Sequence, residues 1–471
     1  MRKLFVIAIL FLSGLGVGRA QNVQKSQEMT VPATQSVEMD VPLDPWSEVS
    51  AEESSVSSES QPSVETKAYP GNFSIDFQLR GRAEYRNGQG ALHSTSALPA
   101  WFVGERARLA LNFKRGVLSA KVSGQHVGVW GDDNLESTKG KLGIHEAWAR
   151  LDAPQGWFAQ FGRQVLSYDD ERIFGANDWS ASGYAHDAFR LGYEHGKHRL
   201  HGIVAFSQSE EKTVGGTYYD GPVPYKNLQF LWYHFGNEQT PFQFSLMGLN
   251  HGYEIGRKNL DGVMVPRTGY MQTLGGWLQY KKNDFFGKAE GYYQLGHDKD
   301  KRPVAAYLGG VRLGYQGSVW GLSLGGDYVS GSKVSGGYGE NNCFNLLYGS
   351  SHIFYGHMDH FTNNNMLSCG LIDGVASAYC RPLKNLSLNL DYHYFMTGVE
   401  RARLHRQLGH EIDFGLRYQV LKDVCVEAGY SLMMPTSVMV YFEGGSNKCR
   451  QDWGWLSLNF SPRIFSSVFK R

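Results

Sequence analysis

The chain has 471 residues and a formal net charge of +1, with 42% hydrophobic and 19% charged residues. Its 57 glycines, 26 tyrosines, 26 phenylalanines and 11 tryptophans make it rich in glycine and aromatic residues but only modestly hydrophobic. Beyond the N-terminal run, no stretch approaches the ~20 apolar residues that a membrane-spanning helix requires. A helical membrane protein is therefore excluded, and a closed barrel is the remaining way for this chain to cross a bilayer.

The first 20 residues have the pattern of a secretory signal peptide. Arg2 and Lys3 precede an apolar run over 4–17, and the small residues Gly18 and Ala20 fit cleavage after Ala20. The alternative is a membrane anchor, but the run is short for a span and no cluster of positive residues follows it.

Residues 21–70 are acidic and poor in large apolar side chains. They hold nine acidic residues and two lysines, and Trp46 is the only aromatic residue before Tyr69. Such a segment buries too little apolar surface to offset the entropy of ordering it. We predict a disordered acidic linker in the periplasm, and its contact with a periplasmic partner is a hypothesis without a motif.

From residue 71 onward, polar and apolar residues alternate along successive segments. In the segment 386–396, Leu388, Leu390 and Tyr392 alternate with Asn389 and Asp391, which gives a strand one apolar and one polar face. The pattern predicts about 18 strands. Their predicted ranges are 72–86, 100–113, 117–130, 143–152, 157–165, 187–195, 198–208, 226–235, 241–252, 267–282, 284–297, 304–316, 318–331, 366–380, 385–398, 407–421, 424–432 and 449–461.

The connections between these strands alternate between short and long. Short turns, such as 114–116 and 421–423, alternate along the chain with long connections, such as 166–186 and 332–365. Outer-membrane barrels have short periplasmic turns and long outer loops, whereas a soluble sandwich has no reason for such alternation. We therefore predict that 71–471 forms an all-β, transmembrane antiparallel β-barrel in the outer membrane of a Gram-negative bacterium, in contact with outer-membrane lipid. Aromatic residues near strand ends are expected in interfacial girdles: Trp101, Trp130, Trp157, Trp277, Tyr280, Trp320, Tyr328, Trp453 and Trp455.

Strand phase also assigns an inward face, and arginine is prominent on it. An arginine facing lipid costs roughly 2–4 kcal/mol at the midplane, so inward placement is favoured. The inward arginines are Arg80, Arg82, Arg106, Arg108, Arg150, Arg190, Arg312 and Arg417. A basic constriction selects anions. The alternative is that these arginines pair with Glu84, Glu146, Asp187, Glu194, Glu411 and Asp413 to fill a wide lumen.

The connection after the fifth strand is dense in charged and aromatic residues, and we expect it to fold into the barrel mouth. Pairs such as Arg172 with Asp170 or Asp178 are expected to hold it there. The Gly162-Arg163-Gln164-x-Leu166-x-Tyr168 stretch, Arg172, Gly175, Asp178-Trp179 and Asp187, with Glu146-Ala147-Trp148 upstream, resemble the signature of the alginate export family of outer-membrane porins.

This resemblance implies an 18-stranded barrel whose arginine-rich lumen passes a negatively charged uronate polysaccharide outward. It further implies that Arg163, Arg172 and Arg190 line the pathway, with Asp170, Asp178 and Asp187 as partners that fix them. The chain departs from the family pattern at Tyr184, Ala185 and His186, where the family usually has Arg and Phe, and in the acidic linker at 21–70.

Catalytic, metal and cofactor signatures are weak in this chain. His357, Asp359 and His360 are metal-ligand residue types, but a solvated loop explains them more simply. No nucleophile elbow, phosphate loop or dinucleotide fingerprint occurs in a suitable setting. Five cysteines allow a disulfide between Cys343 and Cys369 or Cys449 and leave one unpaired. We predict no enzyme, no cofactor, no metal and, given the compartment, no nucleic-acid partner.

The function expected from the sequence is a passive, anion-preferring channel for an anionic polysaccharide or oligosaccharide. A general or nutrient-uptake porin for small anionic solutes is the first alternative. The second alternative is a barrel whose lumen is blocked and whose extracellular loops, above all 332–365, bind a ligand.

Overall fold

The computed structural model describes residues 70–132, 142–214, 216–332, 339–362, 366–400 and 404–469. The predicted signal peptide and acidic linker lie outside these ranges. The barrel wall consists of the following strands: β1 (Gly71–Asn87), β2 (Ala100–Arg115), β3 (Leu118–Val129), β4 (Leu142–Asp152), β5 (Trp157–Gln164), β6 (His186–His195), β7 (His198–Phe206), β8 (Asn227–Phe235), β9 (Phe242–Glu254), β12 (Thr268–Lys282), β13 (Phe285–His297), β14 (Pro303–Gln316), β15 (Trp320–Val329), β16 (Leu371–Leu383), β17 (Leu386–Thr397), β18 (Gln407–Leu421), β19 (Val424–Pro435), β20 (Gln451–Phe460) and β21 (Arg463–Phe469).

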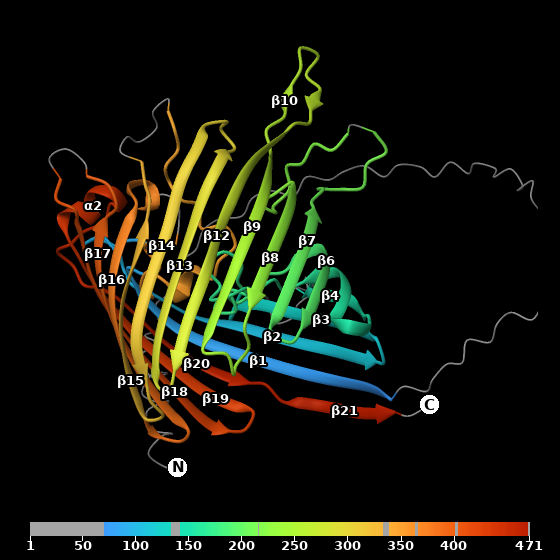
Figure 1. The fold of residues 1–471 in the computed structure, drawn as a ribbon. Helices are drawn as coiled ribbons and strands as arrows, with labels where there is room; N and C mark the ends of the chain where they lie inside the picture. The colour runs from blue at the N-terminus through green and yellow to red at the C-terminus, as the bar shows by residue number, and fades with distance from the viewer. Residues whose placement is uncertain are drawn as a thin grey trace, which may run out of the picture. The chain divides into compact units, whose positions relative to one another are not determined.

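Each wall strand pairs antiparallel with its neighbour in the chain, and the last strands close the barrel on β1 (Figure 1). β20 pairs with β1 over Leu79–Asn87, and β21 pairs with the same strand over Gly71–Asp76. The 19 strands of the sheet therefore fill 18 positions around a closed barrel. The prediction of an 18-stranded antiparallel barrel is confirmed. No helix in the described ranges is long and apolar enough to span a membrane.

Several small elements were not predicted. The connection after β9 carries the hairpin β10 (Arg257–Lys258) and β11 (Met264–Val265), and α2 (Ser437–Glu443) follows β19. Thr436 caps α2, since its hydroxyl accepts hydrogen bonds from the amides of Val438 and Met439. Short 3₁₀ turns occur at η1 (Pro154–Gly156), η2 (Ser351–Ile353) and η3 (Met366–Cys369).

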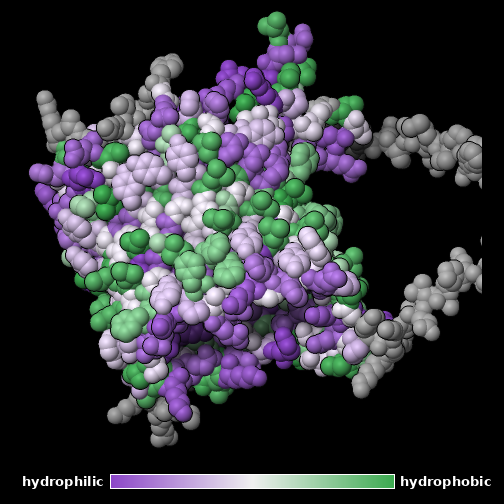
Figure 2. Space-filling model, viewed as in Figure 1, coloured by the Kyte–Doolittle hydropathy of each residue, from purple (hydrophilic) through white to green (hydrophobic). Residues whose placement is uncertain are grey.

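The alternating strands place apolar side chains outward and polar ones inward, as expected. On β17, Leu390 is 48% exposed whereas His393 and Phe395 are buried, and on β18 Phe414 is exposed beside the buried Asp413. Figure 2 shows hydrophobic residues spread over the middle of the viewed barrel wall. This apolar outer surface is what a lipid-facing barrel requires.

The aromatic girdle is only partly as predicted. Exposed members are Trp101, Trp130, Trp157, Tyr280 and Trp320, while Tyr328 is half-buried. Trp277 and Trp453 are buried and Trp455 packs against the same interior cluster, so the prediction was wrong for these three. The physical reason is strand phase, because Trp277 and Trp455 are next to the exposed Leu278 and Leu456, and Trp453 shares the inner face with Trp455.

The barrel interior is filled by two connections that fold inward. The first inner loop is residues 165–185, between β5 and β6, and the second inner loop is residues 339–362, between β15 and β16. Phe174 and Tyr348 form a parallel bridge between them, and the amide of Gly175 donates to the carbonyl of Tyr348 at 2.9 Å. Apolar residues of both loops pack with inward wall residues into one buried cluster, which includes Leu166, Phe174, Phe344, Met358, Phe230 and Leu308. The two loops are thus joined into a single plug.

Candidate functional site

Four arginines on β1 and β2 form a compact patch on the inner face of the wall, here called the arginine quartet (Arg80, Arg82, Arg106 and Arg108). Alternate residues of one strand share a face, and the register pairs Arg80 with Arg106 across the two strands. Like charges directly opposite each other destabilise a sheet unless they are neutralised. The patch therefore requires acceptors from elsewhere.

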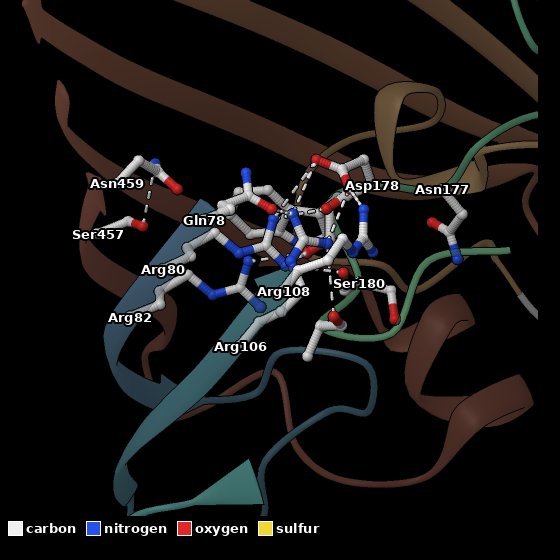
Figure 3. A network of polar contacts seen from close by, with 12 residues as sticks. Gln78, Arg80, Arg82, Arg106, Arg108, Asn177, Asp178, Ser180, Ser457 and Asn459 are labelled. Carbon is white, nitrogen blue, oxygen red and sulfur yellow. Dashed lines mark hydrogen bonds and ion pairs between the residues drawn. The ribbon is translucent and has the colours of Figure 1, made fainter. Parts of the chain in front are cut away.

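The first inner loop supplies those acceptors as a row of backbone carbonyls (Figure 3). Arg80 donates to the carbonyls of Asp178 at 2.6 Å and Ser180 at 2.8 Å, and Arg82 donates to that of Trp179 at 3.0 Å. Arg106 and Arg108 reach the carbonyls of Ala181 and Ser182, each at 3.4 Å. Consecutive carbonyls of 178–182 thus lie along the quartet.

Asp178 is the loop carboxylate at the centre of this contact. Arg106 donates to both of its oxygens, at 2.8 and 3.2 Å, while Arg80 and Arg108 lie at 3.8 and 3.9 Å. Burial acts to raise the pKa of Asp178, but the Arg106 hydrogen bond and the charges of Arg106, Arg80 and Arg108 outweigh it and lower the pKa. The Asp178 side chain remains 58% exposed, whereas that of Arg106 is 1% exposed. The site therefore keeps a solvent-facing side.

An aromatic surface borders the quartet. The guanidinium of Arg82 lies 4.0 Å from the ring centroid of Trp179, and His352 stacks on the same ring with centroids 4.2 Å apart. Trp455 meets Trp179 edge-on at 4.9 Å. Rings and guanidinium groups therefore hold the loop apex against β1 and β20.

The other predicted basic residues of β4–β6 make separate contacts. Arg163 pairs with Asp187 at 2.9 Å. Arg150 pairs with Asp152 at 2.8 Å and reaches Glu194 at 3.7 Å, and Arg190 donates to Gln160 at 2.6 Å rather than to a carboxylate. Further contacts of the predicted set join Glu146 to Lys121 and Trp148, and Arg417 to Glu427.

Arg172 departs from the sequence prediction. It pairs with Glu290 of β13 at 2.7 Å and with Asp327 of β15 at 3.0 Å, not with Asp170 or Asp178. Its side chain is 3% exposed. The first inner loop crosses the barrel, so that Asp178 contacts β1 and β2 whereas Arg172 contacts β13 and β15 on the opposite wall. Asp178 therefore lies too far from Arg172 to pair with it. The resemblance implied that Arg172 lines the pathway. Instead, Arg172 anchors the loop and does not present its charge to a passing solute.

The second inner loop carries the histidines that resembled metal ligands. His352 pairs with Asp359 at 2.8 Å, His360 with Glu443 at 3.0 Å, and His357 lies 3.9 Å from Asp413. Each histidine is thus paired with a different carboxylate, and the described ranges contain no group of side chains arranged to hold a metal ion. Glu411 and Asp413 accept from the amides of Met358 and His357, not from arginines.

Neither candidate disulfide forms. The Cys343 thiol contacts the hydroxyl of Ser332 and the carbonyl of Ser368, and the Cys449 thiol contacts the carbonyl of His93. These cysteines act as small polar packing residues beside the loops.

Some residues of the site were missed from the sequence. Glu290 and Asp327, which hold Arg172, lie on strands whose phase places them inward, so the signal was present but their partner was not evident. The second inner loop gave no comparable signal, since its place inside the barrel depends on contacts with the first.

Comparison with known proteins gives one family match. A family model described as "Alginate export" matches residues 123–435. Among curated proteins, nothing matches the chain.

Solved structures with the same fold include three from Pseudomonas aeruginosa. OpdO is 14% identical with a TM-score of 0.57, covering 83% of this chain and 98% of its own. OpdL is 12% identical with a TM-score of 0.57, covering 83% and 99%. OpdK with vanillate is 11% identical with a TM-score of 0.56, covering 84% and 99%. At these identities the likeness shows the fold alone.

Proposed function

The chain belongs to the alginate export family, and from this premise we propose that it is an outer-membrane channel that prefers anions, with a uronate-type polysaccharide or oligosaccharide as its cargo. Family and fold are those of outer-membrane channels, not of enzymes. Passage is passive, since nothing in the proposal requires an energy source.

One observation carries this proposal: the arginine quartet outnumbers its carboxylates, and the side chains of Arg80, Arg82 and Arg108 keep an exposed fraction of 11–16%. Within the described ranges, Asp178 is the only loop carboxylate paired with the quartet, and Glu84 binds Arg82 and Arg86. Most acceptors of the quartet are neutral, namely the backbone carbonyls of 178–182 and the side-chain amides of Gln78 and Gln125. The surplus positive charge favours anions over cations in the adjoining lumen.

Guanidinium groups also suit the proposed cargo. Their planar donors match the geometry of a carboxylate, so a uronate unit can exchange with the weaker carbonyl acceptors of 178–182. We assign the solute-contacting role to Arg80, Arg82, Arg108, Arg150, Arg163 and Arg190, and also to Arg312 and Arg417 nearer the short turns. The buried Arg106 and Arg172 are positioning residues.

A second candidate is a porin for small anionic solutes. The plug favours it, because the two inner loops meet across the barrel and enclose an apolar cluster that narrows the lumen. The OpdK structure contains vanillate, a small aromatic carboxylate. Under this reading the quartet serves the same electrostatic purpose, and only the size of the solute differs.

Reversal potentials in planar bilayers under a salt gradient test the proposal. We expect anion preference for the wild type and its loss in the double variant Arg80→Ala/Arg108→Ala. The matched control is Arg199→Ala on β7, an exposed arginine that is not among the assigned residues. Cation preference in the wild type contradicts the proposal, and absence of any conductance favours the blocked, ligand-binding barrel.

The size of the cargo is tested by partial block of the current. A linear hexuronate oligosaccharide should interrupt the current of the proposed polysaccharide channel, and the block should deepen with chain length. If a monomeric hexuronate passes while longer chains have no effect, the small-solute porin is the better description.

A further inference from the structure

Lys288 and Arg312 form a second basic pair, on the wall opposite the arginine quartet. They are directly paired residues of β13 and β14. Their strand neighbours Val311 and Leu313 are exposed on the outer surface, so Lys288 and Arg312 face inward. In the part of the chain that the structure describes, neither side chain forms an ion pair or a hydrogen bond. Opposed like charges without a counter-ion are unfavourable in a sheet.

The neighbouring carboxylates are already committed to other groups. Glu290 and Asp327 both bind Arg172, at 2.7 and 3.0 Å. Asp373 interacts electrostatically with Arg312, but it is paired with His393 at 2.9 Å. The lining of this cavity of about 200 Å³ holds three cations and three carboxylates, because Asp170 lies there beside Glu290 and Asp327. Lys288 and Arg312 are the two of these cations that no carboxylate of the described residues binds.

A second cavity of about 350 Å³ adjoins the pair and shares Lys288 in its lining. It lies beside the short turns after β12 and β14, at the end of the barrel that holds both termini of the wall. Its lining includes Gln279, Ser377, Tyr379 and Asn389, which offer amide and hydroxyl groups, together with the charged Lys281 and Asp391. Such groups suit the hydroxyls of a sugar ring, while the two cations suit a carboxylate.

We propose that Lys288 and Arg312 form a capture site for the carboxylate of a hexuronate unit at the periplasmic end of the channel. This inference rests on the proposed function and deepens it, because it gives the cargo a first contact on the periplasmic side. Arg312 supplies the planar donor pair and Lys288 a point charge. A captured chain end then lies on the short-turn side of the plug, across the barrel from the arginine quartet.

The test is sided block of the wild-type channel in an oriented planar bilayer. The probe is a linear hexuronate oligosaccharide of one defined length, added either to the short-turn side or to the long-loop side. In Lys288→Gln/Arg312→Gln we expect half-block from the short-turn side to require about tenfold more probe. Half-block from the long-loop side should stay unchanged.

Controls separate this site from the channel as a whole. Lys422→Gln removes an exposed lysine from the turn between β18 and β19 and should leave block from both sides unchanged. The single variant Lys288→Gln keeps the test usable if the double variant folds poorly, and it should show an intermediate shift. Equal shifts from both sides, or none, overturn the capture site.

Two further outcomes are distinguishable. If the wild type prefers cations and no hexuronate blocks it from either side, the proposed function itself fails. If inorganic phosphate on the short-turn side protects against block as well as a hexuronate monomer does, the site is a general anion site and its assignment to uronate is overturned.

Discussion

Two regions of the inner wall use their charged residues differently. On β1 and β2, the arginine quartet meets the exposed carboxylate of Asp178, the buried Glu84 and a row of neutral carbonyls. On β13 and β15, the buried Glu290 and Asp327 are matched by Arg172 of the first inner loop. The first region has surplus charge in contact with solvent, whereas the second has paired charge removed from it.

The comparison shows that the role of a charged residue depends on how deeply it is buried and on whether an opposite charge is paired with it. A buried, paired charge cannot attract a solute, but it fixes a loop because leaving its partner unpaired is costly. An accessible surplus contributes little to stability, but it sets the sign of the field in the lumen. The first inner loop spans both regions, so one segment is anchored at Arg172 and presents Asp178 at its other end.

The largest expected effect comes from removing the buried anchor. Arg172→Met leaves Glu290 and Asp327 buried without their cation, which should cost about 3–5 kcal/mol. We expect the first inner loop to detach from β13 and β15 and to become accessible to protease. Limited proteolysis and urea unfolding in lipid vesicles measure the two effects.

A compensated variant controls for the anchor prediction. In Arg172→Met/Glu290→Gln/Asp327→Asn no charge is left buried, so most of the lost stability should return. If the triple variant is as unstable as the single one, packing rather than charge anchors the loop.

The second inner loop gives a smaller, steric effect. Gly356 has a φ of +83°, and a Cβ built there would lie 2.6 Å from a carboxylate oxygen of Glu411. Gly356→Ala should therefore cost about 1–3 kcal/mol and displace 355–359 from Glu411. Hydrogen exchange of the Met358 amide measures this, because that amide donates to Glu411 at 2.7 Å. Gly444→Ala, at a positive φ with open space around it, is the control for backbone strain alone.

Most of the fold could be predicted from the sequence, because alternation and loop length are local patterns. All 18 predicted strands occur, with bounds that differ by a few residues; for the strand predicted at 366–380, the structure has Leu371–Leu383. β21 was missed because Ser461 and Pro462 interrupt the alternation before Arg463. The inward phase of Trp453 was also present in the alternation, but aromatic residues near strand ends were assigned to girdles first.

The site was less predictable because its partners lie far apart in the sequence. Arg106 and Asp178 are separated by 72 residues, and Arg172 and Asp327 by 155. Phase gives the face of each arginine, but it does not say which part of a long loop will reach it. The second inner loop lies inside the barrel because of its bridge with the first, which no local pattern records.

The two ends of the first inner loop should respond differently to pH, because the pKa of Asp169 is raised and that of Asp178 is lowered. Burial raises the pKa of Asp169 to about 6, against hydrogen bonds from Ser245 and Trp232, and Asp170 raises it further. His234, 4.0 Å away, is the facing cation when protonated. The raised pKa means that docking of Asp169 is fully favourable below about pH 4 and weakens as the pH rises through 6.

We therefore expect more open-state current noise at pH 7.5 than at pH 4.5. Asp169→Asn should remove most of this difference, because the amide does not ionise. Asp178 stays ionised over this range, since its pKa is lowered, so Asp178→Asn should keep the pH effect. Equal noise at both pH values in the wild type would contradict the assignment to Asp169.

The smallest expected change in stability accompanies a clear change in selectivity. The Asp178 side chain is 58% exposed, and in Asp178→Asn an amide oxygen remains to accept a hydrogen bond from the buried Arg106, so the change should cost about 1 kcal/mol. It also removes the loop carboxylate that offsets the arginine quartet. Anion preference, measured as the reversal potential under a salt gradient, should therefore increase. Asp187→Asn, which frees Arg163 from its pair at 2.9 Å, should act in the same direction but less, because one arginine and not three lies within 4 Å of that carboxylate. If Asp178→Asn lowers anion preference instead, the carboxylate acts by holding the arginines in place, and the surplus of charge is not what selects the solute.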